Sequence, residues 1–194
     1  MQLRPDFLVL YPTDTLYGLG VDATDSAAIS RLLTLKGREA GKPISIMVDS
    51  VEMMERYAEV TPLARRLAEA FLPGKLTLIL HATTCATSGV HPLSERIVGK
   101  DGSVGIRIPD RPEALALVRE CGVPITATSA NVSGMKTEKT PEAILGQFGE
   151  KVSMITLVIN AGELPGDMPS TVVDARGESP VVLREGAISK ESIL

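Results

Sequence analysis

The feature that most constrains the fold of this sequence is a series of short apolar runs, each ended by Pro, Gly or small polar residues. Runs of this length with sharp ends are typical of buried strands. Helical patterns are interspersed among them rather than collected at one end of the chain. We therefore predict strands at residues 7–11, 44–48, 76–80, 103–108, 123–128, 155–160, 170–174 and 181–184.

Five further segments carry the spacing and the end signals of helices. Asp25 or Ser26 can cap the first of them. Thr61 followed by Pro62 can begin the third, because Pro is well tolerated at the first helical position. We predict helices at residues 26–36, 51–57, 62–71, 112–121 and 141–148.

The order of these elements favours one fold class. Strands and helices do not alternate strictly, and the last three strands are consecutive. This order favours a mixed parallel and antiparallel sheet flanked by helices, in an α/β or α+β fold, over a purely parallel sheet. With 194 residues and no internal repeat or linker, the chain is expected to form a single domain over residues 1–194.

Composition excludes several classes of function. Aromatic residues make up only 3% of the chain and Trp is absent, which argues against a stacking platform for single-stranded nucleic acid. The net charge of −4 lacks the basic footprint of a nucleic-acid binder. Cys85 and Cys121 have no metal-ligand spacing. No apolar run approaches membrane-spanning length and no leader is evident, so a cytoplasmic protein without membrane contact is expected.

Small polar residues follow several of the predicted strands. They occupy residues 13–15, 128–131 and 170–171. Ligands often bind at the ends of strands in α/β proteins, so these segments are expected to converge on one cavity. Arg107 lies between isoleucines in a predicted strand, where its charge is costly unless it meets an anion or a carboxylate. The polar segment at residues 82–102 fits a surface loop better than a lid.

Residues 35–43 combine three cations, Lys36, Arg38 and Lys42, with two glycines at the end of a predicted helix. Such a loop can bind phosphate through its side chains and amides. Taken alone, the cations fit a helix C-terminus better, since they stabilise its dipole there. Neither a P-loop nor a G-x-G-x-x-G segment is present.

Seven segments together resemble the YrdC-like family, the threonylcarbamoyl-adenylate synthases. They are YPTDTLYGLG at residues 11–20, KGR at 36–38 with KP at 42–43, PGKLTLIL at 73–80, GIRIP at 105–109, TSANVSG at 128–134, PSTVVD at 169–174 and LREG at 183–186. Each segment is weak evidence alone, but their order and number cover nearly the whole chain.

The resemblance implies an enzyme that joins L-threonine, bicarbonate and ATP into threonylcarbamoyl-AMP and releases pyrophosphate. ATP is then a substrate, Mg²⁺ is expected to accompany it, and no metal ligand is assigned in the chain. A separate tRNA-modifying threonylcarbamoyl transferase complex would use the product. The family fold is a twisted mixed sheet around a deep basic cavity, and no covalent nucleophile is required.

The resemblance also implies the residues of the site. The hallmark Lys-x-Arg and Ser-x-Asn pairs would be catalytic and would hold the nucleotide, and other residues would contact ATP or threonine. The hallmark residues are Lys36, Arg38, Ser129 and Asn131; Ser103 and Arg184 complete the ATP side, and Thr15, Lys42, Arg107, Thr128 and Ser170 form the threonine side. Asp14 is left open between a metal ligand, a base and a simple cap.

Some residues depart from the family pattern. Glu39 stands where many relatives have Pro, Lys42 stands where others have Asn or His, and only residues 1–6 precede the first predicted strand. Three alternatives are kept: a YciO-type paralogue of different activity, the related domain of hydrogenase-maturation carbamoyltransferases, and a module that binds double-stranded RNA or tRNA without catalysis. The acidic pI of about 5.3 disfavours the last of these.

Overall fold

A computed structural model describes residues 6–38, 43–83, 91–165 and 168–194. Its centre is a ten-stranded sheet with the order β10-β9-β5-β6-β3-β7-β2-β1-β8, in which β4 pairs with β5 beside this path. The strands are β1 Val9–Tyr11, β2 Gly18–Gly20, β3 Ser45–Met47, β4 Ala58–Glu59, β5 Leu76–Ala82, β6 Ser103–Arg107, β7 Ile125–Ser129, β8 Leu157–Val158, β9 Thr171–Asp174 and β10 Val181–Arg184.

The sheet is mixed, as predicted from the order of the elements. The pairs β1–β8, β3–β6 and β5–β9 are parallel, whereas β1–β2, β2–β7, β3–β7, β5–β6, β4–β5 and β9–β10 are antiparallel. β3 joins the two halves, because Met47 pairs with Arg107 of β6 on one side and with Ile125 of β7 on the other.

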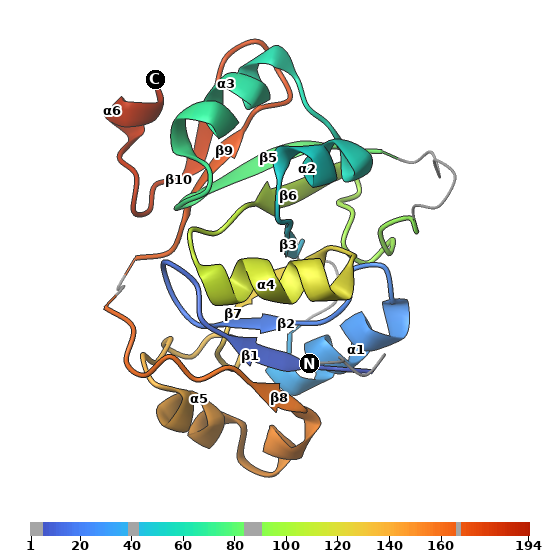
Figure 1. Cartoon of the computed structure of the whole chain (residues 1–194), viewed down its shortest axis with the longest axis vertical. Coiled ribbons are helices and arrows are strands. Elements are labelled where there is room, and N and C mark those ends of the chain that lie inside the picture. The colour runs from blue at the N-terminus through green and yellow to red at the C-terminus, as the bar shows by residue number, and fades with distance from the viewer. Residues whose placement is uncertain (1–5, 39–42, 84–90, 166–167) are drawn as a thin grey trace.

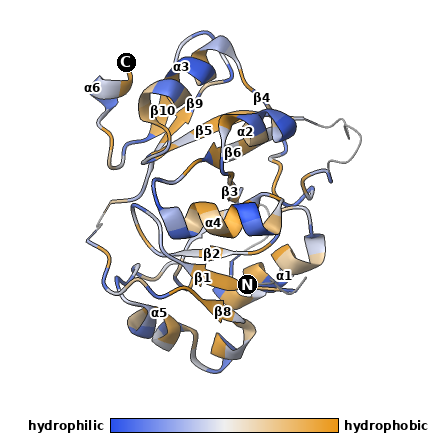
Figure 2. Ribbon diagram, in the orientation of Figure 1, coloured by the Kyte–Doolittle hydropathy of each residue, from blue (hydrophilic) through white to orange (hydrophobic). Residues whose placement is uncertain are grey.

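Helices cover the sheet at both ends and across its middle. They are α1 Ser26–Lys36, α2 Val51–Tyr57, α3 Pro62–Phe71, α4 Pro112–Cys121, α5 Pro141–Phe148 and α6 Lys190–Ile193, with a 3₁₀ turn at Gly149–Met154. Figure 1 shows α4 in front of the central strands, α2 and α3 towards one end of the molecule, and α1 and α5 towards the other. Apolar residues of the strands and of the facing helices form one buried cluster (Figure 2).

The five predicted helices are confirmed, and their caps follow the sequence signals. Asp25 rather than Ser26 caps α1 by accepting from the amides of Ala27 and Ala28. Gly37 ends the same helix in the left-handed conformation, with φ of 59°. Thr61 caps α3 through the amide of Ala64. These local choices agree with the global fold, as expected for a sequence with little frustration.

Four elements were not predicted: β2, β4, the 3₁₀ turn and α6. β2 reads Gly-Leu-Gly, and glycine is uncommon in strands. Here the two glycines make room for neighbouring side chains, because a Cβ on Gly18 would lie 2.8 Å from the Tyr11 ring and one on Gly20 would lie 2.6 Å from Ile125. The predicted strands at 7–11 and 155–160 are also shorter in the structure, at Val9–Tyr11 and Leu157–Val158.

The structure also bears on the predicted loop at residues 82–102 and on the two cysteines. Residues 91–102 contain no helix or strand, while residues 84–90, and with them Cys85, lie outside the described part of the chain. Cys121 is the last residue of α4, and burial raises the pKa of its thiol to about 12. Among the described residues, no helix is long and apolar enough to cross a membrane.

Candidate active site

A cavity of about 390 Å³ opens where the polar segments after β1 and β7 meet the segment before β9. Thr15, Thr128, Ser129 and Ser170 all line it, so the structure brings together residues that lie far apart in the sequence. The charged residues of the described lining are Arg38, Arg107 and Arg184, and no carboxylate is among them. The cavity therefore suits an anionic ligand.

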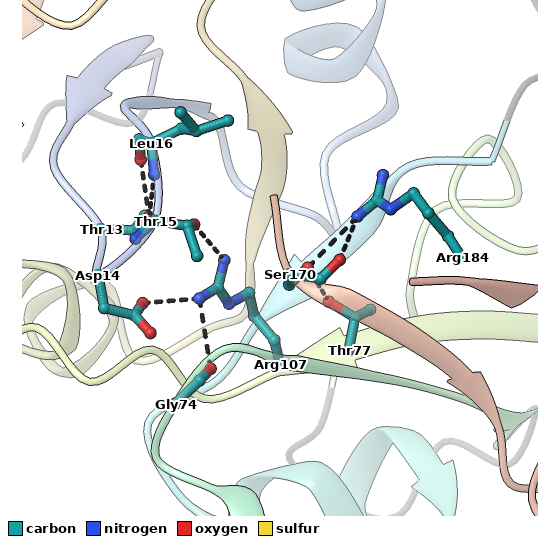
Figure 3. A network of polar contacts seen from close by, with 9 residues as sticks. All are labelled: Thr13, Asp14, Thr15, Leu16, Gly74, Thr77, Arg107, Ser170 and Arg184. Carbon is teal, nitrogen blue, oxygen red and sulfur yellow. Dashed lines mark hydrogen bonds and ion pairs between the residues drawn. The ribbon is translucent and has the colours of Figure 1, made fainter. Parts of the chain in front are cut away.

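Arg107 ends β6 and is fixed by three acceptors. Its Nη2 lies 2.6 Å from Asp14 Oδ1 and 3.3 Å from the carbonyl of Gly74, and its Nη1 donates to Thr15 Oγ1 at 3.1 Å (Figure 3). The carboxylate that this buried charge meets is Asp14, whose Oδ2 is buried and has no hydrogen-bond partner among the described residues. Burial lowers the pKa of Arg107, and the charge of Asp14 opposes that shift.

The turn after β1 is held by its own threonines. Thr13 Oγ1 donates to the carbonyl of Leu16 at 2.7 Å and accepts from the amides of Thr15 and Leu16. Thr15 Oγ1 lies 3.0 Å from Thr13 Oγ1 and accepts from Arg107. The contact between the two hydroxyls and the bond from Arg107 fix the Thr15 side chain at the cavity wall.

A second network lies on the opposite wall. Ser170 Oγ lies 2.8 Å from Thr77 Oγ1, and Arg184 Nη2 donates to the carbonyl of Ser170 at 2.7 Å (Figure 3). Burial lowers the pKa of Arg184, and the positive charge of Arg107 lowers it further. The two guanidinium groups thus destabilise each other across the cavity, and an anion between them would relieve that repulsion.

Arg38 follows the left-handed Gly37 at the end of α1 and lines the cavity. Its Nη2 donates to the carbonyl of Pro43 at 3.1 Å. Arg38 Nε and Arg107 Nε are both buried and have no hydrogen-bond partner in the described chain. A buried donor without a partner is costly, so both groups are suited to an incoming anion.

Arg38 and Ser129 line the cavity, whereas Lys36 and Asn131 are not among its described lining residues. Lys36 is 1% exposed. Lys36 Nζ donates to the carbonyls of Ser129 and Asn131 at 2.5 Å and 2.8 Å. Burial, and to a smaller extent the charge of Arg38, lowers the pKa of Lys36 to about 7. These two hallmark residues therefore lie behind the cavity wall.

Two further predicted residues do not reach the cavity or cannot be placed. Ser103 begins β6, whereas Arg107 ends it, so the two Cα atoms are about 13 Å apart by strand rise. The Ser103 hydroxyl donates to Asp101 at 2.6 Å. Ser103 is not among the described lining residues, and its contact with ATP stays a prediction. Lys42 and Glu39 lie outside the described residues.

The sequence reasoning missed Ser45, Thr77 and Thr137, which also line the cavity. Thr77 was detectable in principle, because it is the one polar residue of an otherwise apolar strand segment at residues 76–80. Ser45 was detectable in the same way, because it is the one polar residue of the predicted strand at residues 44–48. Thr137 carries no local signal, since it lies among ordinary polar and turn residues.

The described residues around the cavity do not form a protein site for Mg²⁺. Mg²⁺ prefers carboxylate oxygens and substrate phosphates as ligands. The described lining offers no carboxylate, Asp14 is engaged by Arg107, and the described chain holds no cluster of three or more potential ligands from His, Cys, Asp and Glu.

Comparison with known proteins identifies relatives over nearly the whole chain. The family model Sua5_yciO_yrdC, described as "Telomere recombination", matches residues 2–186. A protein of Bacillus subtilis (strain 168) named threonylcarbamoyl-AMP synthase is 35% identical over 192 residues, which are 98% of this chain and 53% of the relative. The chain thus spans about half the length of that relative.

Solved structures give the same result. The crystal structure of P. abyssi Sua5 complexed with L-threonine superposes with a TM-score of 0.87 at 35% identity, covering 99% of this chain and 54% of that one. The structure of E. coli YciO superposes with a TM-score of 0.82 at 30% identity, covering 97% and 87%. The predicted mixed-sheet fold is therefore shared with both.

Proposed function

Because the chain belongs to the Sua5/YciO/YrdC family, we propose that it is an L-threonylcarbamoyladenylate synthase, a nucleotidyltransferase that forms threonylcarbamoyl-AMP and pyrophosphate from L-threonine, bicarbonate and ATP. Residues 1–194 act as one catalytic domain in this proposal, supported by the single sheet and the single core cluster. The product would pass to a threonylcarbamoyl transferase complex for tRNA modification in the cytoplasm.

The cavity supports a division of roles. Arg38, Arg184 and Ser129 contact the nucleotide, whereas Arg107, Thr15, Thr128 and Ser170 contact threonine and its carbamate. The observation that carries the proposal is the arginine lining: Arg38, Arg107 and Arg184 line one cavity, the buried Nε of Arg38 and that of Arg107 have no partner among the described residues, and Arg107 already has one carboxylate partner, Asp14. A triphosphate beside a carboxylate supplies the charge that this arrangement lacks.

The reaction needs positioning more than a nucleophilic side chain. The unprotonated amine of threonine attacks the carbon of bicarbonate, hydroxide leaves as water after protonation, and a carbamate results. A carbamate oxygen then attacks the α-phosphorus of ATP, and pyrophosphate leaves. Arginines held in fixed orientations hold the two anions together and stabilise the charge on the leaving group. Mg²⁺ would enter with ATP and neutralise part of the phosphate charge.

Threonine-dependent release of pyrophosphate tests the proposal. The purified full chain is supplied with ATP, bicarbonate and Mg²⁺, and pyrophosphate is measured with and without L-threonine. Release only in the presence of threonine is expected, with serine as the control amino acid to measure specificity. Absence of threonine-dependent release would contradict the proposal, and tight binding of double-stranded RNA without turnover would favour the binding module instead.

The comparisons favour a synthase over the YciO-type alternative. Relatives named threonylcarbamoyl-AMP synthase or putative threonylcarbamoyl-AMP synthase are 35% to 37% identical, against 30% for E. coli YciO. The HypF structure is 24% identical and carries the fold alone. The chain also keeps Lys36, Arg38, Ser129 and Asn131, which the hallmark requires.

A further inference from the structure

Lys36 and Arg38 are two residues apart but face opposite sides of the cavity wall. Gly37 ends α1 between them in the left-handed conformation. Arg38 lines the cavity, whereas Lys36 is buried behind its wall. Lys36 Nζ lies 2.5 Å from the carbonyl of Ser129, 2.8 Å from the carbonyl of Asn131 and 3.3 Å from Asn131 Oδ1. An ammonium group has three N–H donors. These three oxygens account for all of them and leave none for a phosphate.

The turn that follows β7 is tied to the last residue of α1 by main chain as well as side chain. The amide of Ser133 donates to the carbonyl of Lys36 at 2.8 Å. Asn131 Oδ1, which receives Lys36, also accepts from Ser129 Oγ at 2.7 Å, and Asn131 Nδ2 donates to the carbonyl of Met135 at 2.6 Å. The side chain of Asn131 is thus engaged on both sides within the protein.

We propose that Lys36 is a positioning residue that acts through Asn131: it holds the turn at residues 129–133 so that Ser129 and Thr128 face the cavity, while Arg38 makes the direct phosphate contact. The identity of the ligands rests on the proposed function. The division between the two cations rests on the geometry alone. The Lys-x-Arg pair therefore combines a brace with a ligand rather than two equivalent phosphate ligands.

This division predicts a pattern of binding that a phosphate ligand would not produce. Ser129, on the nucleotide side, begins the braced turn, and Thr128, on the threonine side, directly precedes it in β7; both line the cavity. Loss of the brace should therefore weaken the binding of both substrates. Loss of a phosphate ligand should weaken the binding of ATP and leave threonine unaffected.

The test uses Lys36→Met and Arg38→Met in the full chain, with Lys151→Met as a matched control. Lys151 is exposed and its Nζ donates to the carbonyl of Thr34, also near the end of α1, at 3.2 Å. Dissociation constants for a non-hydrolysable ATP analogue and for L-threonine are measured by calorimetry. We expect Lys36→Met to raise both constants about tenfold, Arg38→Met to raise that of the nucleotide alone, and Lys151→Met to change neither.

A double-mutant cycle separates positioning from a general loss of structure. If Lys36 holds the turn partly through the side chain of Asn131, the effects of Lys36→Met and Asn131→Ala on nucleotide binding should be less than additive, since residues of one hydrogen-bond network are not independent. Additive effects, or a Lys36→Met variant that loses nucleotide affinity alone, would overturn the proposal. So would unchanged binding of both ligands.

Amide hydrogen exchange gives an answer that does not depend on the reaction. In the ligand-free protein, Lys36→Met should speed exchange at residues 131–135 and leave β5 protected. If the wild type releases no threonine-dependent pyrophosphate but this exchange pattern is found, the proposed function fails and the brace stands. Should Lys36→Met fail to fold, Asn131→Ala, which removes the Oδ1 acceptor together with the Nδ2 contact to Met135, is held to the same two-ligand pattern. Unchanged exchange in either folded variant would contradict the brace.

Discussion

Arg107 Nη2 lies 2.6 Å from Asp14 Oδ1, and each of the two side chains is only 8% exposed. The pair joins the end of β6 to the turn after β1. Because Nη2 also donates to the carbonyl of Gly74 and Nη1 donates to Thr15, the guanidinium group is fixed in its plane (Figure 3). Its orientation towards the cavity is therefore set before any ligand arrives.

Asp14→Asn should destabilise the protein. The substitution leaves the charge of Arg107 buried without a counter-charge, and breaking a buried pair from one side costs about 3–5 kcal/mol. The free energy of unfolding in urea measures this loss. The matched control is Glu55→Gln, because Glu55 pairs with Arg65 at the exposed surface, where an ion pair contributes less than about 1 kcal/mol. Equal losses in the two variants would contradict the importance of burial.

Lys36 should make stability depend on pH in the alkaline range. Burial lowers its pKa from 10.5 to about 7 in the folded protein. Between these pH values the unfolded chain binds more protons, so the free energy of unfolding should rise with pH, by at most about 1.4 kcal/mol per pH unit. Below about pH 7 the contribution is constant, since both states are protonated.

The difference in unfolding free energy between wild type and Lys36→Met, measured in urea at about pH 6 and about pH 9, isolates this contribution. This difference in unfolding free energy should favour the wild type more strongly at about pH 9 than at about pH 6. Lys151→Met serves as the control and should leave the pH dependence unchanged, because its ammonium group is exposed. A pH-independent difference for Lys36→Met would show that its folded pKa is not lowered.

Arg184→Met should weaken ATP binding. The side chain is held by Ser170 beside the cavity, and it would lose a charge-assisted contact with phosphate. We expect the dissociation constant of ATP to rise roughly 10- to 100-fold, equivalent to about 1.5–3 kcal/mol. The control is Arg176→Met, because Arg176 pairs with Asp174 at the far end of β9 from Ser170. The measurement is calorimetry. Equal losses of ATP affinity in Arg184→Met and Arg176→Met would contradict a specific contact between Arg184 and ATP.

Gly186→Ala should disturb the threonine side of the cavity. A Cβ at this position would lie 2.3 Å from the carbonyl oxygen of Pro169 and 2.7 Å from that of Ser170, so the segment before β9 must shift. We expect a loss of about 1–3 kcal/mol in stability and a higher dissociation constant for threonine. Gly177→Ala is the control, since its Cβ would meet no atom within 4 Å. Normal threonine affinity in Gly186→Ala would contradict the assigned role of Ser170.

Much of the fold could be predicted because its signals are local. Asp25, Thr61 and Gly37 fix helix ends through contacts within a few residues, and apolar runs mark the central strands. β2 escaped prediction because its glycines have no strand preference of their own. Their role depends on the ring of Tyr11, which packs over Gly18 from the neighbouring strand.

The sequence alone determined the mixed α/β class, the family resemblance and several of the polar residues that line the cavity, since these depend on residue types and their order along the chain. Only the tertiary structure decided what each polar side chain faces. Arg107 meets Asp14 across the sheet, and Lys36 donates to the carbonyls of Ser129 and Asn131. A hydrogen bond joins residues that are close in space, and here those residues are about ninety positions apart in the chain, beyond the reach of any local pattern.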